Sequence, residues 1–147
     1  MKVVVQKVSR AKVSAGGRVA GQIGEGLLLL VGIHGLDSFK TIKWVSDKII
    51  KLRVFEDSEG KMNRSVKDVG GSILVVSQFT LYGNIKRGTR PGFTEAAKPE
   101  YAEPLYEDMI RYLKKQSDLH IEEGVFGAAM DIELVNNGPV TILIEKE

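Results

Sequence analysis

The stretch that most constrains this chain is residues 72–83, which begins as an apolar run and ends in polar residues. Residues 73–76 are apolar on both faces of an extended chain, which predicts a strand buried inside a sheet. Ser77, Gln78 and Thr80 follow, and buried polar groups are costly unless each finds a partner. We therefore expect a site at the carboxyl end of this strand, where open α/β sheets bind ligands. The alternative is that these side chains only hydrogen-bond a neighbouring loop, and the residues alone leave both interpretations open.

Length and composition are those of a globular protein with one hydrophobic core. We interpret the 147 residues as one domain spanning residues 1–147, because chains of this size bury about 68–70% of their unfolded surface. The absence of cysteine excludes disulfides, thiolate catalysis and thiolate-ligated metals. The first residues follow a strand pattern and not that of a signal peptide, and no apolar run is long enough to span a bilayer. We therefore expect a cytoplasmic protein without membrane contact.

Positive charge is concentrated in the first two-thirds of the chain. Residues 1–98 contain 17 Lys and Arg against 8 Asp and Glu, whereas residues 99–147 contain 4 against 11. The formal net charge of +2 therefore conceals a basic part and an acidic part. A basic face of this kind is compatible with a polyanionic partner such as RNA, although it does not require one.

Short strands account for most of the apolar pattern. Strand patterns occupy residues 2–9, 11–15, 18–23, 27–33, 53–56, 72–82, 130–135 and 140–144. Glycines separate many of them, and Gly16-Gly17 is typical of a two-residue hairpin turn. The polar stretches 57–71 and 84–94 have no apolar period, so we expect loops there.

Two stretches have apolar residues at helical spacing. The first covers residues 38–52, with Ser38 in the N-cap position, and the second covers residues 99–116. Pro104 leaves open a later start for the second helix, near residue 103. We therefore predict a mixed α/β fold, with a curved, largely antiparallel, barrel-like sheet and two long helices packed on it.

A second unusual stretch is Asn-Asn-Gly-Pro-Val-Thr, residues 136–141, which lies between two strand patterns. Asn-Gly is a strong hairpin signal, and proline is tolerated as the first residue of a strand. The functional alternative is a cis bond before Pro139, which about 5–6% of X–Pro bonds adopt. A cis bond would direct the carbonyls of Asn137 and Gly138 outward as fixed acceptors.

The usual catalytic residue sets are absent from the sequence. The two histidines, His34 and His120, lie far apart and neither has metal-ligand spacing around it. There is no Gly-x-Ser-x-Gly elbow and no conspicuous carboxylate pair. We therefore predict no metal and no cofactor.

Two motifs carry a resemblance to a known family. Ser-Gln-Phe-Thr-Leu-Tyr-Gly at residues 77–83, together with residues 136–141, resembles the two signature motifs of the D-aminoacyl-tRNA deacylases, long called D-tyrosyl-tRNA deacylases. The resemblance also includes residues 1–8, 53–57, 60–65 and 126–128. Asn137 departs from the aspartate expected in many members, but it is a turn neighbour and the rest of the motif is intact.

The resemblance implies a homodimeric esterase that acts on the 3′ end of mischarged tRNA. It would cleave the ester joining a D-amino acid, or glycine, to the terminal ribose. The Gly138–Pro139 bond would be cis and would reach from one subunit into the active site of the other. Its carbonyls would hold the α-amino group of the substrate there, and an L-side chain would collide with the motif.

The resemblance also implies roles for the first motif. Ser77, Gln78, Phe79 and Thr80 would line the pocket around the scissile ester. An activated ester needs little beyond positioning and oxyanion stabilisation by backbone N–H groups, and the neighbouring ribose hydroxyl could help to activate water. Thr80 could instead be a nucleophile, but no base is identifiable near it, so a positioning role is favoured.

Other residues are candidates for contacts to tRNA. Phe126 and Met130 would lie at the terminal adenine, consistent with aromatic stacking on single-stranded ends; the alternative for Phe126 is a core position. Lys86, Arg87 and Arg90 would contact phosphates, unless they only form a solvated loop. Two other function classes remain open at this point: a non-catalytic RNA-binding module, and a small-molecule esterase with Thr80 as its nucleophile.

Overall fold

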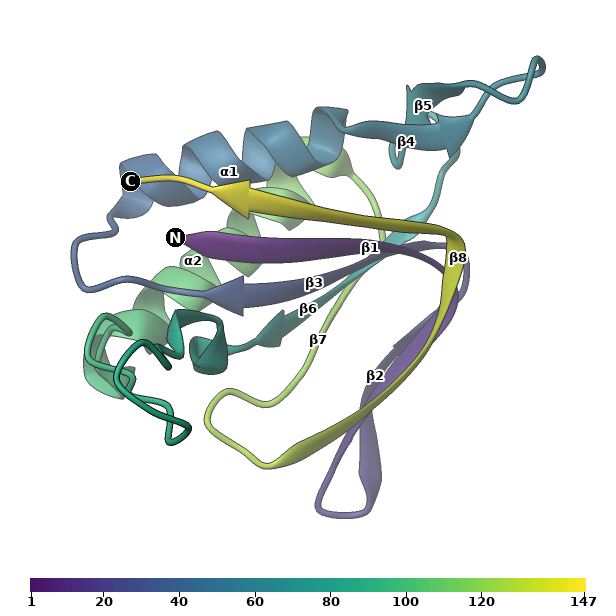
Figure 1. Ribbon diagram of the computed structural model, residues 1–147. Coiled ribbons are helices and arrows are strands. Elements are labelled where there is room, and N and C mark those ends of the chain that lie inside the picture. The colour runs from purple at the N-terminus through teal and green to yellow at the C-terminus, as the bar shows by residue number, and fades with distance from the viewer.

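Strand β1 (Lys2–Ala15) organises the sheet, because three other strands pair with it in the computed structural model, which describes residues 1–147 (Figure 1). All three are antiparallel to it: β2 (Arg18–Ile23), β3 (Gly26–Gly32) and β8 (Met130–Glu145). Two further strands extend the sheet beyond β3 by parallel pairing: β6 (Ser72–Ser77) and β7 (Ile121–Glu123). The order is β2-β1-β3-β6-β7, with β8 along the other side of β1.

The sheet curls because β1 and β8 are long and bent (Figure 1). The first half of β1 pairs with β3, its second half pairs with β2, and β8 accompanies it along its length. A cluster of seven buried residues fills the inside of this curl, with Val13, Leu28 and Val76 among them. The second half of β1, strand β2 and the first half of β8 therefore cover the sheet face that the helices leave free. The predicted curved, barrel-like and largely antiparallel sheet is confirmed.

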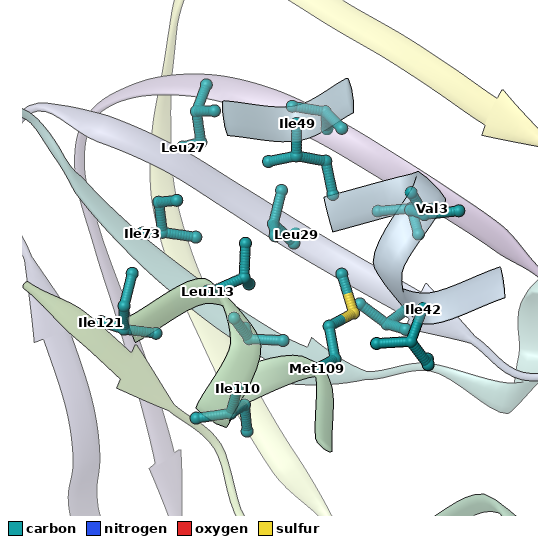
Figure 2. Packing of buried hydrophobic residues seen from close by; sticks show 14 of the residues in the cluster. Val3, Leu27, Leu29, Ile42, Ile49, Ile73, Met109, Ile110, Leu113 and Ile121 are labelled. Carbon is teal, nitrogen blue, oxygen red and sulfur yellow. The ribbon is translucent and has the colours of Figure 1, made fainter. Parts of the chain in front are cut away.

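Helices α1 (Phe39–Lys51) and α2 (Pro99–Ser117) cover the other face of the sheet. The main core lies between them and the sheet and contains 23 buried residues. Figure 2 shows part of this cluster, with Ile42 and Ile49 from α1, Met109 and Leu113 from α2, and Leu29 from β3. No helix of the protein is both long and apolar enough to cross a membrane.

The predicted helix boundaries are correct to within one residue at both helices, and the alternative later start of the second helix is wrong. Ser38 is the N-cap of α1, and its backbone N–H donates to Thr41 Oγ1 at 3.2 Å. Helix α2 begins at Pro99, not near residue 103. Pro104 lies inside this 19-residue helix, where it removes one backbone hydrogen bond, and the buried face of the helix offsets that loss.

Four local predictions are wrong. Residues 2–9 and 11–15 form the single strand β1, and residues 130–135 and 140–144 both belong to β8. The predicted loop 57–71 contains β5 (Met62–Ser65), which pairs with β4 (Arg53–Glu56). The strand predicted over residues 72–82 ends at Ser77, and a short 3₁₀ turn, η1 (Phe79–Tyr82), follows. By contrast, the Gly16-Gly17 hairpin turn is present, with φ of 57° and 74°.

Candidate active site

A pocket of about 570 Å³ opens at the carboxyl ends of the parallel strands β3 and β6. Five segments line it: the end of β3, residues 76–79, the segment before α2 with its first turn, the β7–β8 connection, and the start of β8. The lining residues are Val31, Ile33, Val76, Ser77, Gln78, Phe79, Phe93, Ala96, Ala97, Lys98, Pro99, Ala102, Phe126, Gly127, Ala128, Met130 and Ile132. The pocket lies where the polar end of the buried strand predicted a site.

The polar part of the pocket comes from the residues that follow the buried segment of β6. Ser77 and Gln78 are half-buried and line the pocket. The backbone N–H of Gln78 donates to the carbonyl of Val31 at 2.7 Å, which fixes this residue beside the end of β3. The Gln78 side-chain amide donates to the hydroxyl of Thr80. Ser77 and Gln78 therefore face the cavity from a rigid piece of backbone.

Thr80 lies outside the lining of the pocket and is exposed. Its hydroxyl accepts the hydrogen bond from Gln78 and forms none with a histidine or a carboxylate. A nucleophilic hydroxyl needs an adjacent base, and none lies within hydrogen-bonding distance of Thr80. This geometry suits a residue that orients Gln78 better than a residue that attacks the substrate.

Three phenylalanines, Phe79, Phe93 and Phe126, form part of the pocket wall. Phe79 is 57% exposed and meets Phe93 edge to face, with ring centroids 5.1 Å apart. Phe126 lies 5.6 Å from the ring of Tyr106, whose hydroxyl donates to the carbonyl of Val75 at 2.8 Å. Burial raises the pKa of Tyr106 above its usual range, so the hydroxyl remains a donor. The wall at Phe126 is thereby anchored to strand β6.

The two interpretations of Phe126 both describe part of its environment. The side chain is half-buried and packs against the main core, as the core interpretation requires. It also lines the pocket together with Met130. A flat apolar surface of this kind can stack on a nucleobase.

The cations of the loop after η1 do not enter the pocket. Lys86, Arg87 and Arg90 are exposed and are absent from the lining. Two backbone hydrogen bonds between Asn84 and Gly92, of 2.8 and 3.0 Å, close the base of this loop. Phe93 of the pocket wall follows Gly92 directly. The cations therefore lie on a closed loop that is attached to the pocket wall.

Residues 136–141 form a bulge and not a hairpin turn. Asn136 pairs with Val8 and Thr141 with Gln6, so residues 137–140 of β8 face a single residue of β1. The Gly138–Pro139 peptide bond is cis, and Gly138 has a φ of 124° that L side chains rarely adopt. The hairpin prediction is therefore wrong, because β8 continues along β1 on both sides of the motif.

Asn136 fixes the ends of this bulge, a contribution that sequence reasoning missed. Its Oδ1 accepts the backbone N–H of Val140 at 3.2 Å, and its Nδ2 donates to Thr141 Oγ1 at 2.9 Å. Asn137 makes a longer contact of 3.4 Å to Ser9 Oγ. Hydrogen bonds across a turn are a usual role of Asn, which is the only signal that could have identified Asn136.

The two motifs are not brought together within one chain. Asn137, Gly138 and Pro139 are exposed, and none of them lines the pocket. Asn137 instead lines a separate groove of about 330 Å³ that also contains Lys7 and Arg64. No group of three or more His, Asp or Glu side chains lies close enough together to hold a metal ion.

Comparison with known proteins agrees with this architecture. The family model described as D-Tyr-tRNA(Tyr) deacylase matches residues 4–145. D-aminoacyl-tRNA deacylase of Exiguobacterium sibiricum is 56% identical over 146 residues, which are 99% of this chain and 100% of that protein. The protein of the same name from Halalkalibacterium halodurans is 54% identical over 147 residues, which are 100% of both chains.

Two solved structures are also similar. One, described as c-Myc DNA Unwinding Element Binding Protein, is 43% identical, with a TM-score of 0.93 over 100% of this chain and 99% of the other. A probable eukaryotic D-amino acid tRNA deacylase is 14% identical, with a TM-score of 0.85 over 97% of both chains, and this shows a shared fold alone. Fold, site and relatives define a hydrolase that acts on aminoacyl-tRNA esters. The chain belongs to the D-aminoacyl-tRNA deacylase family.

Proposed function

We propose that this chain removes D-amino acids and glycine from the 3′ end of tRNA, in the cytoplasm, and releases free amino acid and tRNA. The observation that carries the proposal is the pocket at the ends of β3 and β6. It combines the polar side chains of Ser77 and Gln78 with an aromatic wall at Phe126. Its volume of about 570 Å³ is within the range of about 300–1,000 Å³ typical of small-ligand sites. The terminal adenosine and its amino acid are the part of the tRNA that enters.

The reaction needs little from the protein beyond positioning. The ester of an α-amino acid to a ribose hydroxyl is activated, and the neighbouring ribose hydroxyl of the substrate assists attack by water. Ser77, Gln78 and Phe79, which line the pocket, hold the scissile ester, and backbone N–H groups of this segment stabilise the developing oxyanion. Thr80 positions Gln78 and does not form an acyl-enzyme. The hydrogen bond from Gln78 to Thr80 supports this assignment.

Chiral selection comes from a second copy of the chain. In the proposed homodimer, the Gly138–Pro139 bulge of each subunit enters the pocket of the other. The carbonyls of Asn137 and Gly138 accept hydrogen bonds from the α-amino group, so an L-side chain collides with the bulge and a D-side chain points away. Glycine has no side chain to reject. The exposure of all three residues, and their absence from the pocket of their own chain, support this arrangement.

The tRNA is held by two further sets of residues. Phe126 and Met130 contact the terminal adenine inside the pocket, where both side chains line the wall. Lys86, Arg87 and Arg90 contact phosphates of the strand outside it. The exposure of these cations, on a loop that begins beside Phe93, supports this role.

The test is release of labelled amino acid from D-Tyr-tRNA, L-Tyr-tRNA and Gly-tRNA, measured side by side with a chelator present. We expect fast loss of the D-Tyr and Gly labels and retention of L-Tyr. Equal loss of the D- and L-labels would contradict the chiral filter. Binding of tRNA without loss of any label would identify a non-catalytic RNA-binding module. Cleavage of simple esters with no preference for tRNA would identify a small-molecule esterase.

A further inference from the structure

Lys98 is the only charged side chain among the residues that line the pocket. The other polar side chains of the lining are Ser77 and Gln78, which carry no charge. Lys98 precedes α2 directly, in the N-cap position, and its side chain is exposed. A single cation at the edge of a largely apolar cavity marks the place where one negative charge of a ligand is favoured.

The backbone of Lys98 is held by hydrogen bonds, and its ammonium group has no partner within the chain. The carbonyl of Lys98 accepts the backbone N–H groups of Tyr101 and Ala102, both at 2.9 Å, in the first turn of α2. Its ammonium group forms none of the salt bridges of the chain, and it donates no hydrogen bond to another side chain. A ligand therefore does not have to displace a carboxylate in order to bind it.

The proposed substrate offers one anionic group close to the pocket. The carboxyl group of the amino acid is consumed in the ester, the α-amino group is cationic or neutral, and adenine is uncharged. The nearest negative charge is the phosphodiester on the 5′ side of the terminal adenosine. Resting on the proposed function, we propose that Lys98 binds this terminal phosphodiester and so sets how deeply the adenosine enters.

This assignment separates Lys98 from the loop cations. Lys86, Arg87 and Arg90 do not line the pocket, so they reach phosphates further along the strand. Lys98 contacts the phosphate that is attached to the nucleoside inside. Its removal should affect substrates that carry this phosphate and leave unaffected those that lack it.

The experiment compares D-Tyr-tRNA with D-tyrosyl-adenosine, which has the same ester and no phosphate, using Lys98→Gln. We expect KM for D-Tyr-tRNA to rise roughly tenfold with kcat little changed. The salt dependence of log kcat/KM should become shallower by about 0.7–0.9, as for the loss of one phosphate contact. Cleavage of D-tyrosyl-adenosine should be unchanged. Lys98→Arg should restore the tRNA kinetics, and Lys115→Gln, an exposed cation in the last turns of the same helix, should have no effect.

Equal losses on both substrates, or no loss on D-Tyr-tRNA, would overturn the assignment. A second measurement does not depend on catalysis: the binding of adenosine 5′-monophosphate compared with adenosine. The wild-type chain should prefer the phosphorylated nucleoside, and Lys98→Gln should abolish the preference. If the wild type cleaves neither ester, the proposed function fails while this binding difference still decides on Lys98. Identical preferences in wild type and variant would show that Lys98 is only a solvated side chain.

Discussion

Tyr106 supports Phe126 from the side of the core: the two rings lie 5.6 Å apart, and Tyr106 is 2% exposed. The hydroxyl of Tyr106 donates to the carbonyl of Val75 at 2.8 Å, so helix α2, strand β6 and the β7–β8 connection meet at this ring. Phe126 is therefore held by packing and not by its own loop alone. The side of the pocket wall that Phe126 forms is therefore held in place by the core.

Replacing Tyr106 by Phe tests this support. The carbonyl of Val75 keeps the backbone N–H of Gly124 at 2.9 Å, so we expect a loss of only about 1 kcal/mol in the free energy of unfolding. The KM for D-aminoacyl-tRNA should rise severalfold, because the ring beside Phe126 is no longer fixed to strand β6 by the hydroxyl. Denaturant unfolding and steady-state kinetics measure the two effects. Tyr112→Phe is the control, since it removes a hydrogen bond of 2.8 Å to Asp47 away from the pocket; an equal rise in KM there would refute a specific role for Tyr106.

Asn136 is expected to control the shape of the Gly138–Pro139 bulge. Asn136→Ala removes its hydrogen bonds to Val140 and Thr141. A displacement of about 1 Å at a reacting centre can cost about 10²-fold, so we expect kcat/KM on D-Tyr-tRNA to fall by roughly 10- to 100-fold, and L-Tyr-tRNA to be cleaved at a larger relative rate. Gln6→Ala removes only a contact of 3.5 Å to Thr141 and serves as the control. Wild-type selectivity in Asn136→Ala would mean that the bulge holds its shape without this side chain.

Thr80→Ala distinguishes positioning from nucleophilic catalysis. If Thr80 only accepts the hydrogen bond from Gln78, the variant should retain kcat within about tenfold of the wild type in single-turnover assays. Loss of a true nucleophile in a hydrolase costs on the order of 10⁶-fold. Mass spectrometry of the quenched wild-type reaction gives an independent readout, and an aminoacyl group trapped on Thr80 would end the positioning assignment.

Local periodicity predicted the elements that depend on nearby residues. Residues 73–76 are buried, as four consecutive apolar residues in a strand require, and the stripe containing Ile42, Val45 and Ile49 faces the core. Phe39 and Tyr101 are apolar residues of the two predicted helices, 38–52 and 99–116, but remain 51% and 46% exposed. They lie in the first turn of each helix.

The elements that could not be predicted depend on their pairing partners and not on a pattern of their own. Strand β5 has one apolar residue, Met62, followed by three polar ones, and it forms by pairing with β4. The motif at residues 136–141 has the local signals of a hairpin, yet β1 pairs with β8 on both sides of it. No local pattern shows that β1 is long enough to do so.

The site, like the fold, was predictable from the sequence only in part. Ser77 and Gln78 stand out because they interrupt an apolar strand, and both line the pocket. Phe93 and Lys98 lie in segments without any pattern, and only the packing of α2 against the sheet brings them to the cavity. The sequence alone does not show that these segments lie together at the cavity.

Ser46 offers a simple way to stabilise the protein. Its hydroxyl lies in α1, fully buried at 0% exposure, and has no hydrogen-bond partner. Ser46→Ala removes an unsatisfied polar group and introduces a better helix former, so we expect a gain of about 1 kcal/mol in the free energy of unfolding. Ser117→Ala is the matched control in α2, because the Ser117 hydroxyl donates to the carbonyl of Leu113 at 2.6 Å and its removal should destabilise. A loss of stability in Ser46→Ala would show that its hydroxyl has a partner in solution.

The turn between β4 and β5 should open in acid. Hydrogen bonds from the Asn63 side chain and from the backbone N–H groups of Lys61 and Glu59 lower the pKa of Asp57 below its usual range. A carboxylate whose pKa is lowered by folding stabilises the folded form above its unfolded pKa of about 3.9, and this contribution disappears as the pH falls through the lowered value. Amide hydrogen exchange at Glu59 and Lys61 should therefore accelerate below about pH 4, after correction for intrinsic exchange. In Asp57→Asn this pH dependence should vanish, and core amides such as that of Leu29 should stay protected in both proteins. Unchanged protection of the turn down to pH 2 would mean that Asp57 does not hold it.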